Sequence, residues 1–209
     1  WQEAVAEAMA APLHYRRSGS NDYLRSGFKV ETIEFLGMGQ AKRFGWIACP
    51  TGALRERAFL WVPPYGRWSM LPNDYGTRDG FIWLAAWCAK VKAVCADFPF
   101  LSAMDWVLAS RVQRYPLKEL VDFMDTMPLG REVVMHTLSY FDTVTQAARC
   151  RGPTLVSLGL KDPAVRPEQV RAVYDALPGE KRLVEYDWGH DWHPDMVATN
   201  REYLLQVIG

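Results

Sequence analysis

The sequence has no excess of charge of either sign: Lys plus Arg number 24, Asp plus Glu also number 24, and no Lys/Arg-rich run occurs. Nucleic acids and anionic membrane surfaces are bound through basic excess, so neither is expected as a partner. Long apolar runs are missing too, since none approaches the ~20 residues that a membrane span requires. The partner is therefore expected to be a neutral small molecule.

Cysteine is sparse, and its four residues are scattered over positions 49, 88, 95 and 150. No Cys-x-x-Cys pair and no neighbouring histidine cluster occurs, so neither a zinc site nor a disulfide framework is indicated. We expect reduced, mostly buried thiols, no metal and no cofactor. The first residue is Trp1 rather than Met, and a targeting peptide removed before it remains an open alternative.

Of the 209 residues, 49% are hydrophobic, which suits one globular domain over residues 1–209. Helices are expected over Gln2–Ala11, around Leu117–Met124, around Val133–Phe141 and over about Asp195–Ile208, the last packing on a sheet. Phe28–Phe35 alternates apolar and polar residues and is followed by a turn and Arg43–Cys49, a pattern that predicts an antiparallel hairpin. Further strands are expected over Ala58–Val62 and Val91–Asp97, with a short helical piece at Phe81–Cys88 between them.

Residues 153–190 form the clearest unit, a strand, a helix and a return strand. Thr154–Leu160 is an almost continuous apolar run, typical of a strand buried on both faces of a parallel sheet. Pro167 opens a helix that Pro178-Gly179 ends, and Arg182–Tyr186 is the second strand. Each strand is followed by a polar side chain, Asp162 after the first and His190 after the second.

Two parallel strands joined by a helical crossover end on the same edge of the sheet, so Asp162 and His190 are expected to lie close together. A carboxylate that binds one imidazole nitrogen gives the acid–base half of a nucleophile–His–acid triad, and acid before histidine is the α/β-hydrolase chain order. The alternative is that both are ordinary loop residues. A metal site at His190 and His193 is disfavoured because Pro194 interrupts any helix aligning them, and His193 is expected to be a solvated loop residue.

Several motifs together resemble those of the acetylxylan esterase/cephalosporin C deacetylase group, carbohydrate esterase family seven, in the α/β-hydrolase superfamily. They are Leu-Ser-Tyr-Phe-Asp at 138–142, the segment Cys150–Pro163 and the closing Gly189-His190. The resemblance implies an α/β fold with a mostly parallel sheet and flanking helices after the N-terminal hairpin. It assigns the triad acid to Asp162 and the base to His190.

The same resemblance implies further properties. The substrates would be acetyl esters of short xylo-oligosaccharides or similar small alcohols, the protein would be cytoplasmic, and identical chains would assemble as hexamers. The loop after the third strand, Pro63–Arg67, would supply a backbone amide to the oxyanion hole, for which Tyr65 is the candidate.

A nucleophile elbow, Gly-x-Ser-x-Gly, is absent: none of the eight serines has glycine both two residues before and two residues after it. Residues 81–100 resemble the family segment that follows the elbow, so about 60 residues, or two strand–helix–strand units, are missing near Gly80–Phe81. Either a segment of a complete esterase is omitted there, or the chain is a relative that lost its nucleophile and binds without catalysis. The first is favoured because deleting central strands would leave buried backbone groups unpaired.

Overall fold

The computed structural model describes residues 2–10, 12, 14–19, 27–37, 42–52, 58, 60, 86, 88, 90–110 and 117–209. The chain divides into two compact units, Trp1–Leu60 and Trp61–Gly209, which we describe separately. Tyr65, the Gly80–Phe81 joint, and most residues of the strand expected at Ala58–Val62 and of the helix expected at Phe81–Cys88 lie outside the described residues.

The first unit contains helix α1 (Gln2–Ala10) and an antiparallel sheet of β1 (Tyr15–Gly19), β2 (Phe28–Leu36) and β3 (Lys42–Pro50), in the order β1-β2-β3. The β2–β3 pair confirms the predicted hairpin. Strand β1 was not predicted, because Tyr-Arg-Arg-Ser-Gly is polar and all five residues are exposed. Pairing with β2 holds it there, with Ser18 and Thr32 hydroxyls 2.6 Å apart and Arg17 ion-paired with Glu31.

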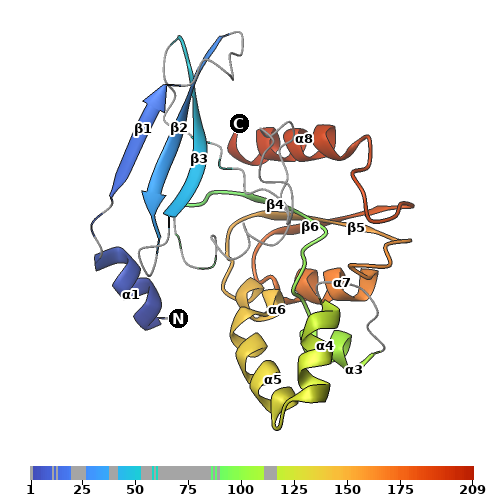
Figure 1. Ribbon diagram of the computed structural model, residues 1–209. Coiled ribbons are helices and arrows are strands. Elements are labelled where there is room, and N and C mark those ends of the chain that lie inside the picture. The colour runs from blue at the N-terminus through green and yellow to red at the C-terminus, as the bar shows by residue number, and fades with distance from the viewer. Residues whose placement is uncertain are drawn as a thin grey trace. The chain divides into compact units, whose positions relative to one another are not determined.

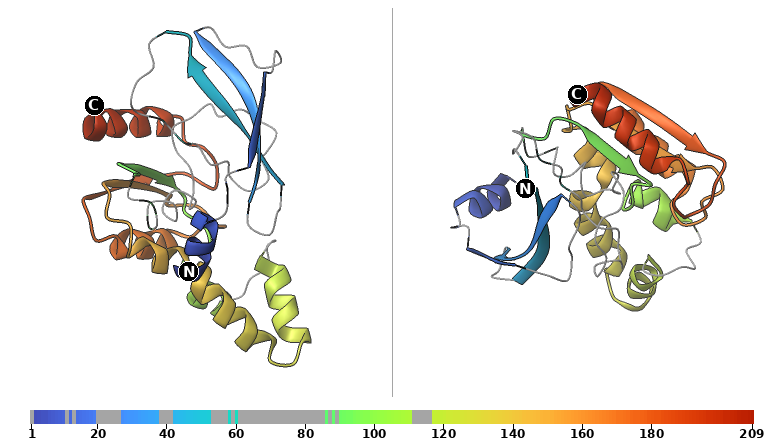
Figure 2. Two further views of the ribbon diagram at one scale, coloured as in Figure 1. Left: turned by 90° about the vertical axis from the view of Figure 1, so that its left-hand side faces the viewer. Right: turned by 90° about the horizontal axis from the view of Figure 1, so that it is seen from above.

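The second unit is built on a parallel sheet of β4 (Val94–Asp97), β5 (Thr154–Gly159) and β6 (Lys181–Tyr186), in that order. Every residue of the central strand β5 is buried, as the apolar run predicted. Figures 1 and 2 show the reason: α8 (Met196–Ile208) covers one face of the sheet, while α6 (Thr143–Ala147) and α7 (Pro167–Ala176) cover the other.

The remaining helices follow β4 and form an αα-hairpin next to a short helix. They are α3 (Met104–Ala109), α4 (Leu117–Thr126) and α5 (Gly130–Phe141), which enclose their own core cluster around Met104, Val107, Leu117 and Val134. The positions of α4 and α5 match the helices expected from the sequence, whereas no separate helix was predicted at α3. Within the described part of the chain, no helix has both the length and the apolar character required to cross a membrane.

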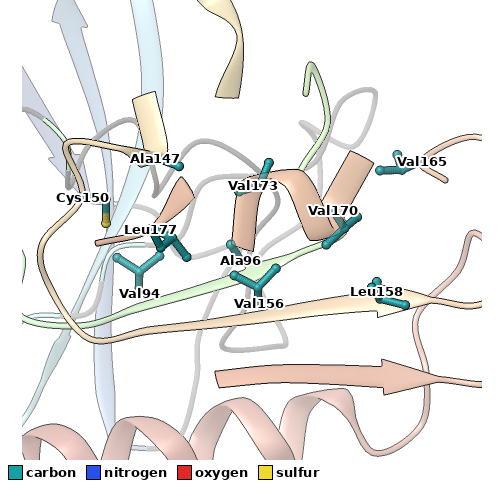
Figure 3. Packing of buried hydrophobic residues seen from close by; sticks show 10 residues of the cluster. All are labelled: Val94, Ala96, Ala147, Cys150, Val156, Leu158, Val165, Val170, Val173 and Leu177. Atoms are coloured by element: carbon teal, nitrogen blue, oxygen red, sulfur yellow. The ribbon is translucent and has the colours of Figure 1, made fainter. Parts of the chain in front are cut away.

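The larger core of this unit lies between the sheet and helices α6 and α7 (Figure 3). Val156 and Leu158 from β5 meet Val170 and Val173 from α7, and none of these four side chains is exposed. Each such burial is worth about 1.5–3 kcal/mol relative to exposure. On the other face, Tyr203 of α8 packs with strand residues, as expected for the last helix. The carboxyl ends of β5 and β6, which Asp162 and His190 follow, are therefore anchored to a packed core.

The segment after β4 has an uncommon backbone. Phe98, Leu101 and Ala103 all have left-handed conformations, with φ of 49°, 53° and 48°. For residues with a Cβ atom, such a conformation costs on the order of 1–3 kcal/mol each and persists only where surrounding bonds hold it.

Candidate active site

Asp162 lies just beyond the end of β5, in the loop that leads to α7. Its Oδ1 accepts hydrogen bonds from the amides of Ala164 and Val165 at 2.7 and 2.9 Å, and its own amide donates to the Gly159 carbonyl at 3.1 Å. The side chain is completely buried. These bonds fix the orientation of the carboxylate through Oδ1 and leave Oδ2 available for another donor.

His190 follows β6, and backbone bonds bind its loop to the loop after β5. The Leu160 amide donates to the Tyr186 carbonyl at 2.8 Å, and the Lys161 amide donates to the Trp188 carbonyl at 2.9 Å. The parallel pairing of the two strands therefore continues past their ends. The expectation that the two polar residues meet at one sheet edge is confirmed.

The Nδ1 atom of His190 lies 2.7 Å from Oδ2 of Asp162. Because the carboxylate is an acceptor, Nδ1 carries the proton, and Nε2 is the basic nitrogen of the neutral ring. The imidazole keeps 31% of its side-chain surface exposed, whereas the aspartate has none. An oriented, solvent-reachable histidine backed by a buried carboxylate is the arrangement that activates a hydroxyl nucleophile.

Gly159, the last residue of β5, was not singled out from the sequence. A Cβ atom there would lie 2.7 Å from the Trp188 carbonyl oxygen, 2.8 Å from the Gly189 carbonyl oxygen and 3.0 Å from a ring carbon of Phe98. Only glycine permits this approach of the His190 loop to β5. Its signal in the sequence is faint: a glycine closing an otherwise bulky strand.

Aromatic side chains surround the pair. The Phe98 ring meets the His190 ring edge-on, with centroids 6.3 Å apart, and is itself buried against Tyr186 and Met196. His193 stacks on Tyr186 at 4.3 Å, and its Nδ1 accepts the amide N–H of Asp195. His193 is a loop residue, as predicted, but it is only partly solvated, because this packing leaves 21% of its side chain exposed.

Among the described residues, no group of three or more His, Cys, Asp or Glu side chains is arranged to hold a metal ion. The four cysteines are free thiols, with Cys95 and Cys150 buried as predicted and the other two partly buried. Burial raises the pKa of the Cys95 thiol well above its ordinary value. It is therefore a core residue, not a nucleophile.

Several described serines have structural roles. The Ser157 hydroxyl donates to Oδ1 of Asp97 at 2.5 Å, and the Ser102 hydroxyl donates to the Pro99 carbonyl at 3.0 Å; both serines are fully buried. Those of Ser110 and Ser139 donate to carbonyls three residues earlier. These hydroxyls stabilise strand ends and helix turns.

The fold and the site together define an α/β hydrolase: a parallel sheet covered by helices on both faces, with an acid and a histidine after consecutive strands. A family model described as acetyl xylan esterase (AXE1) matches residues 79–207. The chain belongs to this acetyl xylan esterase family, and it is accordingly a carboxylic ester hydrolase.

Solved structures agree with this fold. An acetyl xylan esterase from Paenibacillus sp. R4 superposes with a TM-score of 0.81 at 17% identity, over 99% of this chain and 93% of that one. Acetyl xylan esterase 1 from Thermoanaerobacterium sp. JW/SL YS485 superposes with a TM-score of 0.78 at 16% identity, over 100% of this chain and 92% of that one.

Proposed function

We propose that this protein is a serine esterase that removes acetyl groups from acetylated xylo-oligosaccharides or similar small acetyl esters, with His190 as general base and Asp162 as triad acid. The observation that supports this most directly is the 2.7 Å bond between Nδ1 of His190 and the buried, doubly amide-bound carboxylate of Asp162. The family whose model the chain matches is named for acetylated xylan.

The reaction follows from that geometry. Nε2 of His190 takes the proton of the attacking serine as its oxygen bonds to the acetyl carbon, and then returns that proton to the leaving alcohol. The Asp162 carboxylate holds the tautomer and stabilises the transient imidazolium. Backbone amides, with that of Tyr65 as our candidate, stabilise the tetrahedral oxyanion. Water attacking the acyl-serine, again with His190 as base, releases acetate.

The serine itself is proposed to lie in a segment between Gly80 and Phe81, because no serine of the printed sequence stands in a Gly-x-Ser-x-Gly elbow. A second candidate function is favoured by that same observation. A relative without the elbow would bind acetylated sugars and leave them intact. We further propose homo-oligomeric assembly, which sedimentation of the purified protein would measure.

The test is acetate release from acetylated xylo-oligosaccharides, with p-nitrophenyl acetate and butyrate as chromogenic esters. We expect acetyl to be preferred over butyryl, and Asp162→Asn to lower kcat about 10³- to 10⁴-fold because the imidazole loses its tautomer partner. Asp187→Asn is the matched control: that carboxylate belongs to the same pair of loops but is 73% exposed and ion-paired with Lys161.

A wild-type rate equal to the buffer rate on all three esters would reject the esterase. In that event, calorimetric binding of the acetylated oligosaccharide would support the binding protein. Loss of activity in Asp187→Asn equal to that in Asp162→Asn would show that the carboxylate at 162 has no special role.

A further inference from the structure

The Ser-Tyr-Phe-Asp motif at 139–142 has no part in the chemistry described so far, although it is one of the most distinctive stretches of the sequence. It lies where α5 ends and α6 begins. Asp142 is the N-cap of α6, and its Oδ1 accepts the amide of Val144 at 2.9 Å. A serine or threonine would suffice for that cap, so the carboxylate requires another explanation.

The explanation lies in a second chain segment. Oδ1 of Asp142 also accepts the amide of Ala103 at 3.1 Å, and Oδ2 accepts that of Met104 at 2.7 Å. Thr143 extends the contact: its amide donates to the Leu101 carbonyl at 2.8 Å, and its hydroxyl donates to a second carbonyl, that of residue 100, at the same distance. Asp142, the N-cap of α6, and Thr143, its first residue, thus hold the loop 98–104 by four hydrogen bonds.

This loop contains the three left-handed, non-glycine residues Phe98, Leu101 and Ala103. Left-handed backbone is unfavourable for residues with a Cβ atom, so the loop would relax if its external bonds were removed. At its other end, the Phe98 amide donates to the Ser157 carbonyl of β5 at 3.0 Å. Between these ends, Nε2 of Gln169 in α7 donates to the Ser102 carbonyl at 3.0 Å, so the strained loop is held at three points.

Phe98 is where the loop meets the proposed triad. Its ring is 97% buried, stands edge-on to the His190 imidazole and lies close to Gly159. An aromatic edge at this separation is within the range in which ring pairs attract each other. Asp162 binds one nitrogen of the imidazole, and the Phe98 ring limits how far the imidazole can tilt about that bond.

We propose that Asp142 is a positioning residue for His190: it holds the strained loop 98–104, and the loop holds the Phe98 ring against the imidazole. The catalytic consequence rests on the proposed esterase function, whereas the effect on the imidazole does not. Asp142 touches neither substrate nor His190 and acts through Phe98.

The test compares Asp142→Ser with the wild type by proton NMR of the His190 ring and of its Nδ1–H, assigned by the loss of these signals in His190→Gln. Serine retains the α6 cap but is too short to hold Ala103 and Met104. We expect shifted ring signals, a broadened or lost Nδ1–H signal, and kcat lower by about ten- to a hundredfold with KM changed much less. Asp142→Asn keeps one acceptor oxygen and should give a smaller change.

Leu177→Ala is the control for simple loss of stability, since Leu177 is buried at the C-terminal end of α7, near Val94 and Cys150 (Figure 3). It should leave the His190 signals at their wild-type positions. If Asp142→Ser does not fold, Phe98→Leu replaces it, because it removes the aromatic ring without touching the Asp142 bonds. Loss of the Phe98 ring current shifts the His190 ring signals by itself, so the expected result for this variant is a broadened or lost Nδ1–H signal.

Wild-type His190 signals in folded Asp142→Ser, or an Nδ1–H signal as sharp as that of the wild type in Phe98→Leu, would overturn the proposal. Failure of the proposed function is separately visible. If the wild type hydrolyses no ester while the His190 signals still move in Asp142→Ser, the esterase assignment is wrong and the positioning role stands.

Discussion

Replacing Gly159 by alanine tests whether the close approach of the two strand-exit loops creates the Asp162–His190 pair. The added Cβ would lie 2.7 Å from the Trp188 carbonyl oxygen, about 0.7 Å short of the 3.4 Å at which ordinary contact begins. Gly159 is in a regular β-strand, so alanine adds a spatial conflict and no backbone strain. The neighbours are backbone atoms, which cannot swing away as a flexible side chain would.

Moving the loop by that distance would lengthen the Nδ1–Oδ2 separation from 2.7 Å to about 3.4 Å, beyond the range of a hydrogen bond. We expect overpacking to lower the free energy of unfolding by about 1–3 kcal/mol, and kcat to fall by up to about 100-fold. Chemical denaturation measures the first, ester turnover the second, and the His190 Nδ1–H resonance the pair itself.

Gly152→Ala is the matched control. It lies in the same unit just before β5, and a Cβ atom there would come no closer than 3.8 Å to other atoms. It should leave stability, turnover and resonance unchanged. A folded Gly159→Ala protein with wild-type turnover and an unshifted Nδ1–H signal would refute the argument that this glycine sets the geometry of the pair.

Two further predictions concern the buried face toward α8. The Asn200 side-chain amide donates to Oδ2 of the fully buried Asp97 at 2.7 Å. Asn200→Ala should therefore lower the free energy of unfolding by about 1.5–3 kcal/mol, the value of a hydrogen bond to a charged group. Urea denaturation measures this change, and a loss of less than about 0.5 kcal/mol would contradict the prediction. Burial raises the pKa of the Cys95 thiol, so the folded state retains a proton that the unfolded chain releases above about pH 8.5, and stability falls as pH rises from there. Denaturation at pH 7, 9 and 10 should show a shallower decline in Cys95→Ala, and parallel curves would refute that assignment.

The elements of the second unit from β5 to β6 can be predicted from the sequence because their patterns are strong. The apolar run 154–160, Pro167 at a helix start and the turn at Pro178-Gly179 predict β5, α7 and β6 within a residue or so. Because parallel strands end at the same edge of the sheet, this topology requires Asp162 and His190 to lie close together. Their catalytic role is a separate proposal.

Other features could not be predicted because they depend on distant partners. The exposed, polar β1 exists only by pairing with β2, and the place of His193 comes from stacking on Tyr186. The role of Gly159 depends on a loop 29 residues later in the chain. The left-handed conformation of Ala103 has no signal in the neighbouring sequence, because the side chain that binds its amide is that of Asp142, far along the chain.

The most direct test of the esterase assignment is labelling with a fluorophosphonate, which bonds covalently to an activated serine, followed by intact mass and peptide mapping of the wild type and His190→Gln. The account predicts one adduct on a serine of the wild type, no adduct in His190→Gln, and an unlabelled mass several kilodaltons above the 23.9 kDa of the printed chain. An unlabelled wild-type protein of 23.9 kDa that is folded would contradict it, and the Asp162–His190 pair would then have no nucleophile to activate.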